Sequence, residues 1–442
     1  MSEPRGKTET VSGTAFGTSS GHRQDIHWSI FVVVISAVIG TAAMLLTPFT
    51  VPMPAYWDLA LEFSRSFKIN GTFHADFYPA MLGFGLHSLG PLGYAYVQFA
   101  MYIAFAIACY ATLRILRMRA PWAASLAIVL ALFPDVAGGI KKIWDVDASC
   151  MTFVVIACCI FLVAARGESA IRSICLGAVW GTGIAIRPNY PFLIAPIALA
   201  FWFALSKDQN IWRKIAIRLL LVCSVAFITC AMCNYWAHGA FYWPQNGPYN
   251  FYQGANRFTE EVIESNLNPE SSITLSMESG DFGNVTAAEL PARTSAFDAF
   301  DPNDSLTQFS PLYMRLGLQY VKSRPFHWVF KLGALKLFTV LRPDTKVHPL
   351  FSPIGLCRLI LSCALPVWIL VLCAQTRKRW TRIHLITAAI IVCYCIPFVL
   401  TTGDPRYGIS LNLFLWMMTA YHLYKMADDS TSAGGLRLVF HR

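Results

Sequence analysis

The stretch Trp28–Phe49 (WSIFVVVISAVIGTAAMLLTPF) contains no charged residue. A helix needs about 20 apolar residues to cross the hydrocarbon core of a bilayer, so this stretch predicts a membrane-spanning helix. It is long and has no small-residue cleavage site, which favours a retained helix over a signal peptide. A second stretch, Leu356–Ala374, is interrupted only by Arg358. The chain is therefore expected to be a polytopic membrane protein.

The composition of the 442 residues supports this reading: 55% are hydrophobic, only 14% are charged, and the mean hydropathy is +0.49. In soluble domains about a quarter of the residues are charged. The net charge of +10 would suit nucleic acid, but the basic residues occur in short clusters between apolar stretches, as in cytoplasmic loops. The 13 cysteines lie almost entirely in apolar stretches and are expected to pack as small side chains without disulfides. We expect membrane lipids as surroundings and no nucleic-acid partner.

Apolar runs between these clusters predict an all-α integral membrane protein with about ten transmembrane helices. The expected spans are residues 28–49, 92–113, 121–138, 148–165, 173–187, 191–206, 217–236, 353–374, 384–401 and 408–424.

The basic clusters set the orientation. Arg114–Arg119, Arg166–Arg172, Lys207–Lys214 and Arg377–Arg382 all fall on one side, with both termini. That side is the cytoplasm by the positive-inside rule, which suggests a bacterial inner membrane. The predicted organisation is a disordered cytoplasmic N-terminus (1–27), an N-terminal transmembrane module with catalytic outer loops (28–236), a long periplasmic loop (237–347), a C-terminal transmembrane module (348–426) and a cytoplasmic tail (427–442).

The outer loops contain further expected elements. Pro79–Gly90 is apolar but too short to span, which favours an interfacial or re-entrant segment. Tyr56–Phe67 has the spacing of an amphipathic surface helix. In the long loop, the acidic stretch Glu260–Asp304 is expected to be irregular, followed by a helix at Leu312–Ser323 and an interfacial helix at Phe330–Arg342.

Four cations on the outer side are candidates for holding a donor phosphate. Lys141 and Lys142 run against the positive-inside trend and either bind a phosphate as point charges or snorkel to lipid headgroups. Arg187 and Arg406 each sit beside a proline at an outer helix end. Their guanidinium groups suit bidentate phosphate binding; alternatively, they pair with a neighbour such as Asp404.

Four outer carboxylates are candidates for catalysis. Asp145 and Asp147 stand at the mouth of a span and could bind a divalent metal (Mg or Mn), act as a general base or neutralise the nearby lysine pair. Asp58 lies on the expected surface helix, and Asp76 lies in the turn after it. Either could reach a reacting group at the bilayer surface.

The segment Phe241–Phe258 (FYWPQNGPYNFYQGANRF) interleaves aromatic residues with Asn, Gly and Pro. Such a segment can stack on sugar rings and bond their hydroxyls, although aromatic residues also form belts at membrane interfaces. The candidate sugar-binding residues are Tyr249, Asn250, Tyr252 and Asn256.

Seven short segments occur in order across residues 28–424: Tyr56–Ala60, Tyr78–Pro79, Asp147, Arg187–Pro188, Asn250–Asn256, Tyr320–Leu337 and Pro405–Tyr407. In combination they resemble the GT-C superfamily of polytopic glycosyltransferases. The most similar members are bacterial, of the protein mannosyltransferase type or the type that transfers aminoarabinose or galacturonic acid to lipid A.

This resemblance implies transfer of a sugar, with inversion, from a polyprenyl-phosphate carrier to an envelope acceptor on the periplasmic face. The acceptor would be lipid A, a polysaccharide or a protein. In the family a first-loop carboxylate serves as base or positions the acceptor, basic residues hold the phosphate, and some members use a divalent metal. The usual first-loop aspartate is absent here, because Pro52 and Met53 occupy its place. Either the base has moved, with Asp76 and Asp58 as the first candidates, or Asp145 and Asp147 serve in its place, or the chain is not a standard transferase.

Two other function classes remain open at this point. A flippase or transporter of a lipid-linked glycan would use the same phosphate-binding cations but no base. A non-catalytic assembly protein of an envelope polymer would need neither. The placement of charges at helix ends, rather than at mid-membrane, favours the transferase.

Overall fold

In the computed structural model the described residues are 19–51, 54–70, 76–143, 145–167, 169–206, 208–239, 241, 247–265, 271–279, 310–341, 360, 365–376, 381–401 and 408–432. Within these ranges nearly every element is a helix. The only β-pairing among them is an isolated bridge between Thr50 and Lys142. The cysteines whose side chains are described are free thiols.

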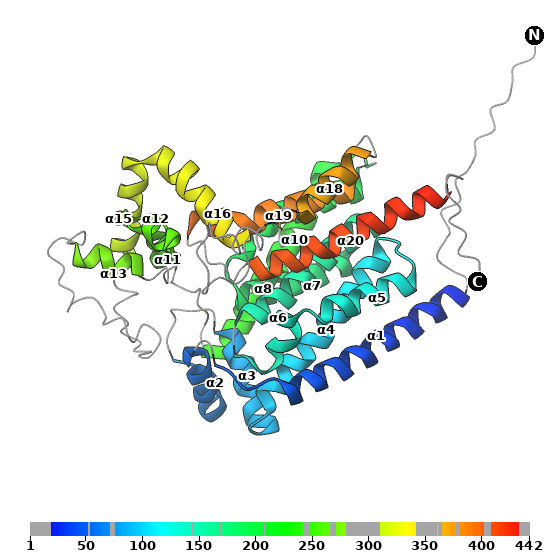
Figure 1. The fold of residues 1–442 in the computed structure, drawn as a ribbon, viewed down its shortest axis with the longest axis horizontal. Helices are drawn as coiled ribbons and strands as arrows, with labels where there is room; N and C mark the ends of the chain where they lie inside the picture. The colour runs from blue at the N-terminus through cyan, green and yellow to red at the C-terminus, as the bar shows by residue number, and fades with distance from the viewer. Residues whose placement is uncertain are drawn as a thin grey trace, which may run out of the picture.

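A helix covers most of each predicted span except 353–374, where a helix begins only at Leu365 and residues 353–359 and 361–364 lie outside the described part. The helices of the spans lie side by side in one bundle (Figure 1). They are α1 (Ser19–Leu46), α4 (Gly93–Ile115), α5 (Ala120–Ala131), α7 (Asp145–Arg166), α8 (Ala170–Ile186), α9 (Ile194–Leu205), α10 (Ile211–His238), α18 (Leu365–Thr376), α19 (Arg382–Leu400) and α20 (Gly408–Ser432).

Within the described part of the chain, five helical stretches are long and apolar enough to cross a membrane: Gln24–Leu46, Gly93–Ile115, Ala148–Arg166, Ile211–His238 and Arg382–Leu400. Several apolar helices of this kind indicate a multi-pass membrane protein. The count of ten spans stays a prediction.

The bundle is organised around α7, which packs against α4, α8, α9 and α20. Its side chains Phe153 and Phe161 are fully buried, and both rings contact Phe414 of α20. In contrast, α1 and α10 expose long apolar faces, including Val38 and Phe227. In a bilayer such faces contact lipid, whereas the buried aromatic groups hold the helices together.

Two predicted boundaries differ from the structure. The expected span 121–138 ends as a helix at Ala131, and a short helix α6 (Pro134–Ala137) and a 3-10 turn (Gly138–Lys141) follow. The break precedes Pro134 because the residue before a proline is disfavoured in the α conformation. At the N-terminus, α1 begins at Ser19, inside the segment 1–27 that was expected to be disordered.

The two ends of the bundle carry different residues. At one end, Arg114 Nε donates to Asp25 Oδ1 at 2.8 Å, and Arg119 Nη2 donates to Asp428 Oδ1 at 3.1 Å. We call this the basic end. It joins the first helix, the α4–α5 connection and the last helix, as the predicted orientation requires.

The opposite end, which we call the loop end, is defined by two contacts between segments distant in sequence. Thr50 pairs with Lys142 in the isolated bridge, and the Ile69 amide donates to the Ala237 carbonyl at 2.8 Å. The first and second outer loops and the start of the long loop therefore meet there. Which end faces the cytoplasm stays a prediction.

Shorter helices lie at the loop end. They are α2 (Pro54–Ser66), α3 (Phe77–Leu89), α11 (Gly247–Gln253), α12 (Thr259–Glu264), α13 (Ser271–Glu278), α15 (Ser310–Ser323), a π-helical turn (His327–Leu332) and α16 (Gly333–Leu341). Figure 1 shows α11, α12, α13 and α15 clustered apart from α2 and α3.

Most of the elements predicted in the outer loops can be compared with these helices. The expected surface helix, the apolar segment after it and the helix Leu312–Ser323 are present as α2, α3 and α15. The interfacial helix begins three residues earlier than expected, at His327. The expectation of irregular structure after Glu260 is wrong for the residues of α12 and α13, and residues 280–309 lie outside the described part.

Candidate functional site

Asp76, a sequence candidate for the base, is the residue that precedes α3 and is fully buried. Its Oδ2 atom lies 3.4 Å from Nε2 of His238, the last residue of α10. The other ring nitrogen, Nδ1, lies 3.0 Å from the carbonyl of Ile69. Because a carbonyl only accepts, Nδ1 carries a proton and Nε2 faces the carboxylate. The pair is favourable when a proton lies between Nε2 and Oδ2, so it can store one transferable proton.

Close backbone packing against α2 and α4 fixes the position of α3 and therefore the position of Asp76. A Cβ added at Gly83 would lie 2.5 Å from the Ala60 carbonyl of α2, and one at Gly85 would lie 2.5 Å from the Gly93 carbonyl of α4. Larger side chains at these two positions would push α3 away from its neighbours. The start of α3 is thus set by contacts along its whole length.

A buried hydrogen-bond chain links α3 to the second outer loop. The Tyr78 hydroxyl donates to Gln98 Oε1 at 2.9 Å, and Gln98 Nε2 donates to the Ile140 carbonyl at 3.2 Å. Ile140 directly precedes Lys141, a predicted phosphate ligand. The chain therefore ties the candidate base and the lysine pair to the same end of α4.

The two lysines of the second outer loop are half-buried and differ in their contacts. Lys141 Nζ donates to the Thr47 carbonyl at 3.2 Å, just beyond the last turn of α1, where carbonyl groups attract a cation. Lys142 takes part through its backbone in the bridge to Thr50. An ammonium group has three donors, so Lys141 can hold a phosphate oxygen in addition to Thr47.

Arg187 is half-buried and caps the end of α8. The turn after it is fastened to α7, because the Tyr190 hydroxyl bonds Ser149 Oγ at 2.6 Å and the Ser149 carbonyl at 2.7 Å. Trp180 Nε1 also donates to the Tyr190 carbonyl at 2.8 Å. Arg187 is thereby held beside the first turn of α7, which begins at Asp145.

The structure describes fewer contacts for the remaining charged candidates. Asp145 and Asp147 belong to the first turn of α7, but their side chains lie outside the described part, as does all of Arg406. Asp58 is exposed on α2, in contrast to buried Asp76. Among the described side chains, three or more His, Cys, Asp or Glu do not come together as a metal site; the metal stays untested at Asp145 and Asp147.

The predicted sugar-binding residues lie in and just after α11. Tyr249 and Tyr252 are buried and contact the ring of Tyr313 on α15, with centroids 5.4 and 6.0 Å apart. Asn250 is half-buried. Asn256 is buried and holds the turn, since its side chain bonds the Tyr252 carbonyl, Ser272 and the Phe258 amide. Contact with a sugar stays a prediction for all four.

Lys336 of α16 is a buried cation that sequence reasoning did not single out as a site residue. Its Nζ donates to the carbonyls of Gly254 and Val399, at 2.5 and 3.1 Å, and lies 5.6 Å from the ring of Trp328. Burial lowers the pKa of Lys336 to about 7. A neutral amine has two N–H donors, which matches the two carbonyls. The signal available in the sequence was one lysine on the apolar face of an amphipathic helix.

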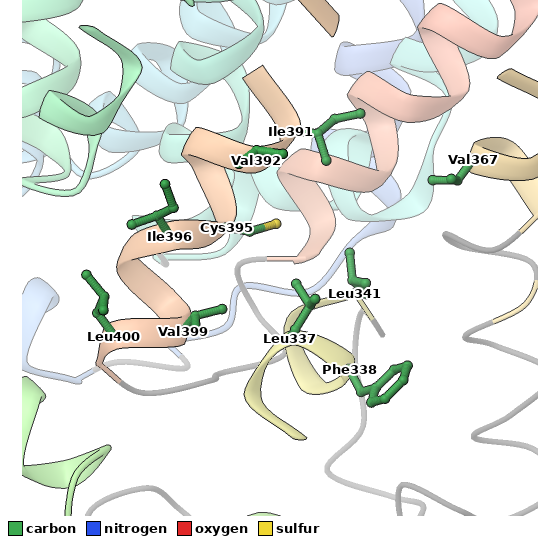
Figure 2. A pocket seen from close by; sticks show the side chains of 10 residues that line it. All are labelled: Leu337, Phe338, Leu341, Val367, Ile391, Val392, Cys395, Ile396, Val399 and Leu400. Atoms are coloured by element: carbon green, nitrogen blue, oxygen red, sulfur yellow. The ribbon is translucent and has the colours of Figure 1, made fainter. Parts of the chain in front are cut away.

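Beside Lys336, an entirely apolar pocket of about 530 Å³ opens between α16, α18 and α19. Figure 2 shows its lining side chains, among them Leu337 and Phe338 of α16, Val367 of α18 and Val399 of α19. Among the described lining residues, the thiol of Cys395 is the only side-chain group that is not a hydrocarbon. The pocket can therefore accept only an apolar chain or ring.

The fold is similar to that of an archaeal oligosaccharyltransferase. That protein is AglB from Archaeoglobus fulgidus, solved in complex with an inhibitory peptide and a dolichol-phosphate. The TM-score is 0.51 at 14% sequence identity, over 94% of this chain and 52% of AglB. The chain thus spans about half the length of AglB. At this level of identity the likeness concerns the fold alone.

Comparisons of sequence gave no further relatives. No family model matches the chain, and no curated protein matches it.

Proposed function

We propose that the chain is a membrane glycosyltransferase that moves a sugar from a polyprenyl-phosphate donor to an envelope acceptor on the periplasmic face. The acceptor would be lipid A, a polysaccharide or a protein. The observation that carries this proposal is the buried Asp76–His238 pair, which lies at the same end of the bundle as Lys141 and Arg187. A carboxylate able to accept a proton and cations able to hold a phosphate are the two components that this transfer needs.

The chemical step is one displacement. The acceptor hydroxyl oxygen forms a bond to the anomeric carbon, while the bond from that carbon to the carrier phosphate oxygen breaks. The electron pair of the broken bond leaves with the phosphate, and Lys141, Lys142, Arg187 and Arg406 stabilise its growing negative charge. The hydroxyl proton passes to the Asp76 carboxylate. A single displacement inverts the configuration at the anomeric carbon.

His238 supports Asp76 in this scheme. By bonding Oδ2 it fixes the carboxylate, and as a cation it would keep Asp76 ionised. Because Asp76 is fully buried, an acceptor hydroxyl reaches it only after neighbouring residues move. We therefore expect the acceptor to open the loop end before the reaction.

The lipid chain and the sugar of the donor would contact other parts of the protein. The apolar pocket between α16, α18 and α19 suits an isoprenoid chain, and Asp145 and Asp147 would position the donor or hold a divalent metal. The sugar would contact the segment Tyr249–Asn256.

The test is an assay with purified protein in detergent, a polyprenyl-phosphate sugar and candidate acceptors, with the products identified by mass spectrometry. A transferase forms a covalent product and releases polyprenyl phosphate, and Asp76→Asn removes most of that product. A flippase forms none, because detergent leaves no two sides to cross. In a deletion strain, loss of one envelope sugar that wild type restores and Asp76→Asn does not would identify the acceptor.

A further inference from the structure

A polar cavity, distinct from the apolar pocket beside Lys336, lies within the loop-end helix cluster. It has a volume of about 210 Å³ and is lined by Tyr252, Asn256, Arg257, Leu316 and Tyr320. Since a water molecule occupies about 30 Å³ of liquid, the cavity has room for one pyranose ring. Figure 1 shows that its helices, α11 and α15, lie apart from α3, where Asp76 begins the helix.

The lining is chemically mixed in the way that sugar sites are. Tyr252 and Tyr320 supply aromatic rings for the C–H faces of a sugar, and Leu316 supplies apolar contact. Arg257 supplies five N–H donors in a fork that matches a carboxylate or a phosphate. Its guanidinium lies 4.8 Å from the Phe258 ring centroid, which helps to orient the fork.

The Tyr320 hydroxyl is oriented by a relay of side chains. It lies 3.3 Å from His327 Nδ1, and His327 Nε2 lies 2.9 Å from Glu260 Oε2. The other oxygen of Glu260 pairs with Lys331, and these two neighbours lower the pKa of the Glu260 carboxyl. An ionised carboxylate accepts the proton of Nε2, and the Nδ1 atom on the other side of the ring holds the Tyr320 hydroxyl in one orientation. The free lone pairs of the Tyr320 oxygen are then available as an acceptor for a ligand hydroxyl.

The opposite wall is equally fixed. The side chain of Asn256 is held by hydrogen bonds to Tyr252, Ser272 and Phe258, and its backbone amide donates to Thr259 Oγ1 at 3.2 Å. The turn that carries Arg257 is therefore rigid before any ligand binds, which lowers the entropy lost on binding.

We propose that this cavity binds an anionic sugar residue, namely one pyranose ring that carries a carboxylate or a phosphate. Arg257 holds the anionic group, the Tyr320 oxygen accepts from a ring hydroxyl, and the Tyr252 and Tyr320 rings contact the C–H face. The cavity includes Tyr252 and Asn256 of the segment proposed above to contact the sugar, so this inference names the chemical class of that sugar and rests on the proposed function.

Binding can be measured without any transfer, so the outcome does not depend on the proposed transferase activity. The full chain in detergent is titrated, by saturation-transfer NMR, with methyl glucuronide, glucose 6-phosphate and neutral methyl glucoside. Both anionic probes are expected to bind more tightly than the neutral one, and the tighter of the two identifies the anionic group. Arg257→Gln should raise the dissociation constant of that probe about tenfold or more, as expected for loss of a charge-assisted bond.

Two further variants separate ligand contact from folding. Tyr320→Phe keeps the ring and removes the hydroxyl, and should weaken all three probes. Arg315→Gln changes an exposed arginine on α15, the helix that carries Tyr320. Arg315 does not line the cavity, so this variant should leave binding unchanged. Equal binding of the neutral and anionic sugars, binding of none of the three, or equal effects of Arg257→Gln and Arg315→Gln would overturn the proposal.

Discussion

His238 Nε2 lies 3.4 Å from Asp76 Oδ2, with both side chains buried. The contact joins the end of α10 to the start of α3 and thus holds the first outer loop against the beginning of the long loop. The Ile69 carbonyl fixes the imidazole on its other side. A carboxylate in this position has a defined orientation and a defined proton partner, which an exposed carboxylate such as Asp58 lacks.

The first prediction concerns the candidate bases. Asp76→Asn should lower the rate of sugar transfer about 10²- to 10⁴-fold, the usual effect of removing a general base. Asp58→Asn should have a much smaller effect, because Asp58 is exposed. The measurement is the turnover number in detergent at equal amounts of folded protein. Equal losses for the two variants would contradict the ranking of Asp76 above Asp58.

The second prediction concerns the pair itself. His238→Gln should destabilise the fold by about 3–5 kcal/mol, because it leaves a buried charge without its partner. In the double variant with Asp76→Asn the two destabilisations should not add, since residues in contact are coupled. The measurement is thermal unfolding of the four proteins. Additive effects would mean that the 3.4 Å contact contributes no energy.

The helices of the bundle could be predicted from the sequence because they depend on local properties. An uninterrupted apolar run such as Trp28–Phe49 forms a helix whatever its neighbours are, since a bilayer demands internal backbone hydrogen bonds. Arg114, Arg119 and Asp25 were also expected at the same end of the bundle, because successive membrane spans run in opposite directions. Within the site, Asp76, Lys141 and Arg187 could be named because charges close to membrane depth are costly and usually have a function.

The rest depends on contacts between distant segments. His238 is one polar residue at a helix end, and only the fold brings it to Asp76. Lys336 looks like an ordinary charge on an amphipathic helix until α16 packs against α19. Helix α13 was missed because Ser271–Glu278 is a weak helical sequence that is stabilised by burial of Ile273.

The third prediction uses the pKa of Lys336. Because the folded pKa of about 7 lies below the ordinary lysine pKa of 10.5, the unfolded chain binds more protons between these values. Stability should therefore rise with pH from about 7 to 10.5, at up to about 1.4 kcal/mol per pH unit. Lys336→Met should remove this rise, whereas Lys322→Met, at an exposed position, should keep it. Unfolding temperatures measured across this pH range test the difference, and parallel curves for wild type and Lys336→Met would refute it.

The fourth prediction concerns the junction of the long loop with α19. A Cβ added at Gly254 would overlap the Thr401 carbonyl and lie 2.9 Å from Lys336 Nζ. Gly254→Ala should therefore destabilise the protein by about 1–3 kcal/mol, as overpacking does. Gly247→Ala is the matched control, because a Cβ there meets nothing within 4 Å. Equal unfolding temperatures for both variants would show that the junction rearranges to accommodate the added methyl group.

The last prediction separates donor binding from chemistry. Lys141→Met and Arg187→Gln should each raise the KM for the polyprenyl-phosphate donor about 10- to 100-fold, the usual effect of losing a charged hydrogen bond to phosphate. Lys68→Met, which removes an exposed cation at the same end, should change KM little. Tyr190→Phe should act like a weaker Arg187→Gln, because it releases the turn after Arg187 from Ser149 without changing any charge. If Lys68→Met raised KM as much as Lys141→Met, the cations would act only through the general positive field of the loop end, and neither Lys141 nor Arg187 would contact the phosphate.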